Sequence, residues 1–236
     1  MPGSRRNKNA CRAGFLCYNI GFCMQVALVR QKIKINFAKE GVLRFISHHD
    51  IMRLFHRAFR RADIELRRSE GFNPQPRMSF AMPLGLGIES DCEALFVETA
   101  RWYRPEEVLQ RLAAALPEGM RLTGAELAPA GRGGVYPTEV EYAVPLPSGI
   151  DSGALAGKAE ELLSRQSIPV ERAKKARTKT FDLRPSILDL AVRENELTIK
   201  LRVTPKGTAR PDEILRALGM PQPVRMRRTA LRLTTG

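Results

Sequence analysis

The chain has 236 residues, 43% of them apolar and 27% charged, and this ordinary globular composition excludes a collagen-like, coiled-coil or wholly disordered protein. Thirty-nine lysines and arginines against 25 acidic residues give a net charge of +14, which points toward polyanionic partners. Residues 31–167 are neutral, with eighteen groups of each sign, whereas residues 168–236 carry sixteen basic against seven acidic groups. We therefore expect a positive field on the second half, with a solvated surface that has no ligand as the alternative.

The first thirty residues combine basic groups with an apolar stretch, as a signal peptide does. Asn19 and Gln25 interrupt that stretch, and no small-x-small cleavage site precedes Arg30. We expect residues 1–30 to be a disordered or mis-started extension, with translation beginning at Met24; export is the alternative. The stretch is too short and too polar to span a membrane, so no membrane association is expected.

Three of the four cysteines, Cys11, Cys17 and Cys23, are spaced six residues apart, and Cys92 stands alone in a predicted strand. Zinc and iron–sulfur sites use closer pairs such as C-x-x-C. We therefore expect no metal, no cofactor and no disulfide framework. Reduced thiols are typical of the cytoplasm, which is the expected location.

The first half is predicted to alternate strands and helices. Ile33, Ile35 and Phe37 lie on one side of a strand over 32–37, and Ser47 is placed to cap a helix whose apolar residues recur at helical spacing as far as Ala62. The elements that follow are strands at 64–69, 78–82 and 92–99 around a Pro-rich loop at 71–77, a helix at 104–116 and a strand at 120–127.

The same order of elements returns after a glycine-rich connection. Helices are predicted at 152–164 and 211–218, between strands at 139–146, 168–173, 179–183, 187–192, 197–203 and 224–233. Residues 104–109 (RPEEVL) are echoed in an equivalent place by residues 210–215 (RPDEIL), which indicates an internal duplication. The order predicts an α+β fold of tandem ferredoxin-like (βαββαβ) domains with antiparallel sheets, at 31–128 and 139–236, joined by a linker at 129–138.

The predicted first helix has a cationic side. At 100° per residue, a stripe opposite the apolar face holds His49, Arg53, His56 and Arg60, with Arg57 and Arg61 beside it. Such a cationic ridge suits a phosphate backbone. A solvated helix face is the alternative. His48, at the edge of the apolar face, is a candidate base for attack by a ribose 2′-hydroxyl, but no second catalytic group stands at a telling spacing.

The loop between the second and third strands is unusually stiff, because Pro74 and Pro76 hold it extended. Rigid loops often carry ligand contacts, and a proline-fixed connection without a ligand is the alternative. Phe72 and Phe80 are expected to anchor the loop in the core. The residues expected to contact a ligand are Asn73, Gln75 and Arg77.

Two basic runs in the second half are expected to build a patch for a nucleic-acid backbone if their strands are neighbours. With 6% aromatic residues and no RNP-type motif, phosphate contact is favoured over base readout by stacking. The residues of these runs are Arg172, Lys174, Lys175, Arg177, Lys179, Arg225, Arg227 and Arg228.

The segments 32–39, 43–53 and 71–80 together resemble the radical S-adenosylmethionine-linked (radical SAM-associated) domain family of unknown function, and the resemblance covers most of residues 31–232. It implies a bacterial accessory protein of RNA metabolism whose partner is a cobalamin-binding radical SAM protein. It carries over no catalytic residue, and His49 stands where the family more often has Leu. The chain also lacks the C-x-x-x-C-x-x-C cluster of a radical enzyme, so the partner would hold that iron–sulfur site.

These observations favour a non-catalytic RNA-binding module that acts in RNA modification or processing. One alternative is a metal-independent ribonuclease that uses His48 as its base. Another is a protein-binding scaffold whose charges serve solubility. The sequence thus favours a protein that is not an enzyme, with the ribonuclease as the enzymatic alternative.

Overall fold

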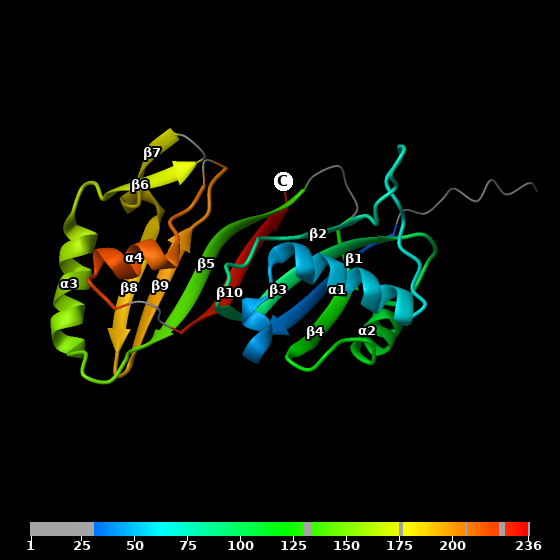
Figure 1. The fold of residues 1–236 in the computed structure, drawn as a ribbon, viewed down its shortest axis with the longest axis horizontal. Coiled ribbons are helices and arrows are strands. Elements are labelled where there is room, and N and C mark those ends of the chain that lie inside the picture. Colours follow the sequence, from blue (N-terminus) through cyan, green and yellow to red (C-terminus); the bar gives the residue numbers. More distant parts are fainter. Residues whose placement is uncertain (1–30, 130–133, 175–176, 206, 222–224, 236) are drawn as a thin grey trace, which may run out of the picture.

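The computed structural model describes residues 31–129, 134–174, 177–205, 207–221 and 225–235. The extension expected at 1–30 lies outside these residues. Over the described residues the chain is an α+β protein with four helices and a large, mostly antiparallel sheet (Figure 1). The predicted α+β class is thereby confirmed, whereas the tandem ferredoxin-like plan and its boundaries stay predictions. No helix within these ranges is long and apolar enough to cross a membrane.

The first half packs two helices against one face of its strands (Figure 1). Ile33, Ile35 and Phe37 alternate toward the helices and are almost completely buried, together with Phe55 and Phe59 of the first helix. This alternation is why the first strand forms where the sequence predicts it. The elements are β1 (Gln31–Lys39), η1 (Gly41–Phe45), α1 (His48–Arg61), β2 (Met78–Phe80), β3 (Ile88–Thr99), α2 (Pro105–Ala113) and β4 (Met120–Leu127).

The second half builds a separate apolar core, in which Val144, Leu197 and Ile199 of the sheet pack with Leu155 and Ile214 of the helices. Its elements are β5 (Val135–Pro145), α3 (Ser152–Ser164), β6 (Pro169–Lys174), β7 (Arg177–Asp182), η2 (Arg184–Ser186), β8 (Ile187–Arg193), β9 (Glu196–Arg202), α4 (Pro211–Ala217) and β10 (Met226–Thr235). Strands β6 and β7 form a two-stranded sheet of their own.

The two halves are joined through a parallel pair of strands, β3 and β10, so that the large sheet has the order β4-β1-β3-β10-β5-β9-β8, with β2 also paired to β3. Arg228 of β10 lies inside this junction, with 1% of its surface exposed. Its guanidinium donates to Glu93 at 2.9 Å, to the Tyr142 hydroxyl at 3.1 Å and to the Pro83 carbonyl at 2.9 Å. Lys39 is also fully buried near Glu93 and Arg228, and burial lowers its pKa.

The strand predicted at 64–69 is wrong. Leu66 and Arg68 make isolated bridges instead, to Thr99 and to Pro76 respectively. The backbone of Arg67 donates to Glu98 of β3 and accepts from Arg77 on the returning loop. Because its hydrogen bonds are divided between two partners, the segment forms no continuous ladder with either of them.

Candidate nucleic-acid interface

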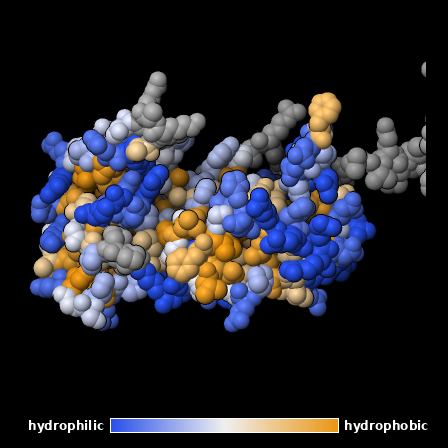
Figure 2. Space-filling view, in the orientation of Figure 1, coloured by the Kyte–Doolittle hydropathy of each residue, from blue (hydrophilic) through white to orange (hydrophobic). Residues whose placement is uncertain are grey.

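The outward side of α1 carries the predicted cationic ridge. Arg53, Arg57 and Arg60 are all exposed, whereas Ile51 and Phe55 are buried on the opposite side. Figure 2 shows hydrophilic side chains gathered over α1. Arg53 lies 3.5 Å from Asp50 in an exposed pair, and neither Arg57 nor Arg60 has a carboxylate partner among the described residues. The structure thus brings these three arginines together on one solvent-facing side.

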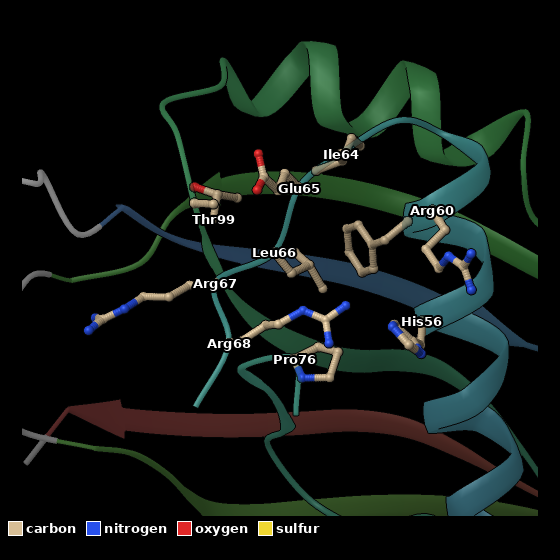
Figure 3. Close-up of a pocket in the computed structure, with 11 residues that line it drawn as sticks. His56, Arg60, Ile64, Glu65, Leu66, Arg67, Arg68, Pro76 and Thr99 are labelled. Carbon is tan, nitrogen blue, oxygen red and sulfur yellow. The ribbon is translucent and has the colours of Figure 1, made fainter. Parts of the chain in front are cut away.

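A cavity of about 480 Å³ opens beside the C-terminal half of α1 (Figure 3). The helix contributes Phe59 and two polar side chains to it, and the segment that follows the helix contributes Ile64 and Leu66. Phe59 and Ile64 are buried, so the floor of the cavity is apolar. Pro76 and Thr99 also line the cavity, which ties it to the stiff loop and to β3.

The polar residues divide the cavity into a cationic end and an acidic end. His56, Arg60 and Arg68 surround one end, with Arg68 directed toward His56, and Glu65 lies at the other end (Figure 3). Arg68 donates to the Pro74 carbonyl at 3.3 Å and has no carboxylate partner in the described ranges. Arg67 is directed away from the cavity and pairs with a carboxylate of β3 at 3.3 Å (Figure 3). The cationic end is therefore electrostatically prepared for an anion.

The pKa of His56 reports this excess of positive charge. Burial makes the largest contribution to lowering the His56 pKa, and the positive charges of Arg60 and Arg68 lower this pKa further. A proton-detected NMR titration of the His56 ring should give a pKa below the usual 6.5, and Arg68→Gln should raise it. Since the folded protein binds this proton less readily than the unfolded chain, the free energy of unfolding should fall as the pH drops through the window just below 6.5. A His56 pKa at or above its usual value would contradict the account of this end of the cavity.

The stiff loop projects from the edge of the cavity. Two hydrogen bonds join Ser69 and Gln75 across the loop. The Ser69 backbone N–H donates to the Gln75 carbonyl at 2.8 Å, and the Gln75 backbone N–H donates to the Ser69 hydroxyl at 3.0 Å. The Gln75 side chain donates to Asn73 at 3.0 Å, and both amides are exposed. Arg77 is half-buried near Glu98, at 3.8 Å. Asn73 and Gln75 are therefore open to a ligand, whereas Arg77 is engaged in the fold.

The expectation that Phe72 anchors the loop in the core is wrong, because its side chain is fully exposed at the loop tip. Gly71 adopts a φ of +124°, and the turn that it makes carries the next residue away from the body. Phe80 does enter the core, where its ring packs against Phe37 and Phe55 at 5.9 Å between centroids. An exposed aromatic ring beside a cationic surface is thus a feature that sequence reasoning missed.

The arginines at 225–228, at the start of β10, do not form the expected patch. Arg228 is buried at the junction, so it is withdrawn from the surface that the sequence predicted for it. Arg225 and Arg227 are bound to Glu89, at 3.1 and 3.0 Å, and Arg227 also pairs with Asp91 at 2.7 Å. Burial raises the pKa of Glu89, but hydrogen bonds from Arg225, the Gly41 backbone and Arg227 outweigh it, so the net pKa is lowered. The positive charges of Arg225 and Arg227 are therefore largely neutralised by carboxylates within the fold.

The other basic run lies on the β6–β7 hairpin, which is not a neighbour of β10 in the large sheet. Arg172 stacks on the Phe181 ring at 3.8 Å and pairs with Glu213 at 2.6 Å. Lys179, opposite Arg172 in the register, is exposed. Lys175 and the side chains of Lys174 and Arg177 lie outside the described residues. The two runs are thus not brought together on neighbouring strands.

His48 lies in the first turn of α1, and its ring contacts Phe80 edge-on at 5.2 Å between centroids. It shares a cavity of about 10 Å³ with Lys39 and Glu93. Such a volume has room for about one water molecule and none for a ribose. Across the described ranges, no three His, Cys, Asp or Glu side chains gather as metal ligands, and burial raises the pKa of the Cys92 thiol to about 11.

Arg68 is the functional candidate that sequence reasoning overlooked, although the sequence contains a signal for it. Residues 53–68 hold six arginines against two acidic residues. Averaging the charge over residues 31–167 conceals this local excess. The signal becomes clear when the helix and the segment after it are taken as one surface.

The fold and this face together define an α+β protein with a cationic, cavity-bearing surface on its first half. A model of the family described as "uncharacterized protein conserved in bacteria (DUF2344)" matches residues 32–212, so the chain belongs to that family. This agrees with the resemblance to a bacterial domain family of unknown function, whereas the link to radical SAM chemistry stays a prediction. No curated protein matches the chain.

Proposed function

We propose that this protein is a non-catalytic RNA-binding module. The observation that carries the proposal is the side-by-side placement of the α1 ridge and a cavity whose Arg60 and Arg68 have no carboxylate partner among the described residues. An arginine without a carboxylate partner can contact a phosphate at little cost in free energy, because no internal ion pair must break. We therefore assign RNA binding in this proposal to the first half of the chain, which also carries the stiff loop.

Single-stranded RNA suits this surface better than a regular duplex does. The exposed Phe72 ring offers a platform on which an unpaired base can stack, and the half-buried Leu66 offers apolar surface over the buried floor of the cavity. Both features require bases that are not already stacked in a helix. Asn73 and Gln75, exposed beside Phe72, supply amide groups for hydrogen bonds to base edges or to the sugar.

The finer assignments of the sequence belong to this proposal. The strand orders β4-β1-β3-β2 and β10-β5-β9-β8 are equivalent, with antiparallel neighbours in each, which supports the tandem ferredoxin-like plan at 31–128 and 139–236. The resemblance supports a bacterial cytoplasmic module that presents RNA to a radical SAM protein for modification or processing. A partner of that kind would catalyse the reaction, and this chain would bind the RNA.

Fluorescence anisotropy with a labelled single-stranded RNA of about 15 nucleotides tests the proposal. We expect saturable binding that weakens steeply with added salt, and intact RNA after prolonged incubation in chelator. Cleavage that disappears in His48→Ala would instead establish the metal-independent ribonuclease. Failure of the folded protein to bind RNA at low salt would contradict the proposal and favour a protein-binding scaffold.

A further inference from the structure

We infer that the cavity beside α1 binds one nucleoside monophosphate unit, with its phosphate between Arg60 and Arg68 and its base on the half-buried Leu66. The inference deepens the proposed RNA binding and rests on it for the source of the nucleotide. The ridge would hold the strand by its phosphates, and the cavity would receive a single unit that is turned out of the strand.

The size and lining of the cavity suit a nucleotide. A volume of about 480 Å³ falls within the usual range of small-ligand pockets and accommodates a base, a sugar and a phosphate. Leu66, which is half-buried, presents an apolar surface at the centre of the cavity (Figure 3), and the fully buried Phe59 also lines it. A planar base can cover this surface and remove it from water.

The distribution of charge selects a ligand with two unlike ends. At one end, the guanidinium groups of Arg60 and Arg68 and the ring of His56 converge (Figure 3). Phosphate oxygens accept strong, charge-assisted hydrogen bonds from arginine. At the other end, the Glu65 carboxylate is exposed and has no hydrogen-bond donor to its oxygens among the described residues. A carboxylate there accepts hydrogen bonds from a ribose hydroxyl or an exocyclic amine, whereas a second phosphate would be repelled.

The lowered pKa of His56 adds a property that can be measured. The ring and its two arginine neighbours repel one another when no anion is present. A bound phosphate offsets that repulsion and favours the protonated ring. Binding of a nucleotide should therefore raise the His56 pKa.

Isothermal titration calorimetry with AMP and CMP, together with NMR of the His56 ring, tests the inference on the full chain. Each nucleotide should bind and raise the His56 pKa, while adenosine and inorganic phosphate should bind at least about tenfold more weakly. Arg60→Gln and Arg68→Gln should each weaken AMP binding by about tenfold. Glu65→Gln should weaken it less. The matched control is Arg216→Gln, which removes an exposed arginine in the second half and should change nothing.

The outcomes separate this inference from the proposed function. If RNA binds but AMP and CMP leave the His56 ring unperturbed at millimolar concentration, the cavity is not a nucleotide site and the ridge alone holds RNA. If AMP binds as described but RNA does not, the site takes a free nucleotide and the RNA proposal fails. Tight binding of adenosine or of inorganic phosphate, equal to that of AMP, would overturn the two-ended arrangement. Circular dichroism of each variant confirms that the fold is retained.

Discussion

Glu93→Gln is expected to lower the free energy of unfolding by about 3–5 kcal/mol, because it removes the anionic partner of a buried ion pair. Arg228 and Glu93 are both nearly inaccessible and lie 2.9 Å apart. The substitution leaves Arg228 and Lys39 buried together without the carboxylate that balances them. Urea denaturation followed by circular dichroism measures the change.

Replacing the other member of the pair, Arg228, should lower the free energy of unfolding by a smaller amount. In Arg228→Met, the buried Lys39 remains available to balance Glu93, and methionine fills much of the volume of the arginine stem. The variant still loses the hydrogen bonds that Arg228 makes to Tyr142 and to Pro83. We therefore expect a loss of about 1–3 kcal/mol and a double variant whose loss is smaller than the sum of the two.

The pH dependence of the stability of Glu93→Gln gives a second test of the role of the buried pair. Loss of the Glu93 charge removes an influence that raises the pKa of Lys39, so this pKa falls further below its usual value. The folded Glu93→Gln protein then binds the lysine proton less readily than its unfolded chain, and its stability should recover as the pH rises toward 10.5. Glu161→Gln, which breaks an exposed pair with Arg165, is the control and should cost no more than about 1 kcal/mol. Equal small losses in Glu93→Gln and in this control would contradict the role given to the buried pair.

Replacing the three ridge arginines together, as Arg53→Gln, Arg57→Gln and Arg60→Gln, should weaken binding of single-stranded RNA by about 100-fold at about 0.1 M salt. Each phosphate contact contributes a slope of about −0.7 to the dependence of log K on log salt, so three contacts are worth roughly two powers of ten at this concentration. Anisotropy titrations of the wild-type and variant proteins measure the loss.

A matched variant isolates position from total charge. Arg165→Gln, Arg193→Gln and Arg216→Gln remove the same three charges from exposed sites on the second half. We expect less than about threefold loss for this variant, since long-range attraction is largely screened at this salt concentration. Comparable losses in the two variants would mean that RNA responds to net charge alone and that the ridge is not its site.

Local signals explain which parts of the fold the sequence predicts well. Ser47 accepts a hydrogen bond from the Asp50 backbone at 3.1 Å, so α1 begins where its predicted cap places it. The helix predicted at 152–164 is also observed, and there Asp151 accepts a hydrogen bond from the Gly153 backbone at 2.8 Å. The parallel pairing of β3 with β10 joins residues far apart along the chain, and no local pattern specifies it. Arg228 illustrates this: the sequence predicts an arginine at the surface, whereas its buried partners Glu93, Tyr142 and Pro83 explain why it lies inside.

The candidate site was predicted in part. Helical periodicity places Arg53, Arg57 and Arg60 on one exposed side, because the apolar residues of α1 leave no other orientation. The cavity could not be predicted from the sequence, since it depends on how the segment after α1 bridges Thr99 and Pro76. The exposure of Phe72 depends in the same way on the path of the loop, because an aromatic residue beside prolines is equally compatible with a core anchor and an exposed tip.

The most direct test of the ridge as the RNA site is the salt dependence of affinity, measured for the wild type and for both triple variants between about 50 and 400 mM salt. The ridge together with Arg68 offers four guanidinium groups, which corresponds to a slope of roughly −2.8 for the wild type. The ridge variant should lose about 2 from this slope, and the second-half variant should retain the wild-type value. Equal slopes for all three proteins would contradict the assignment of the RNA site to α1.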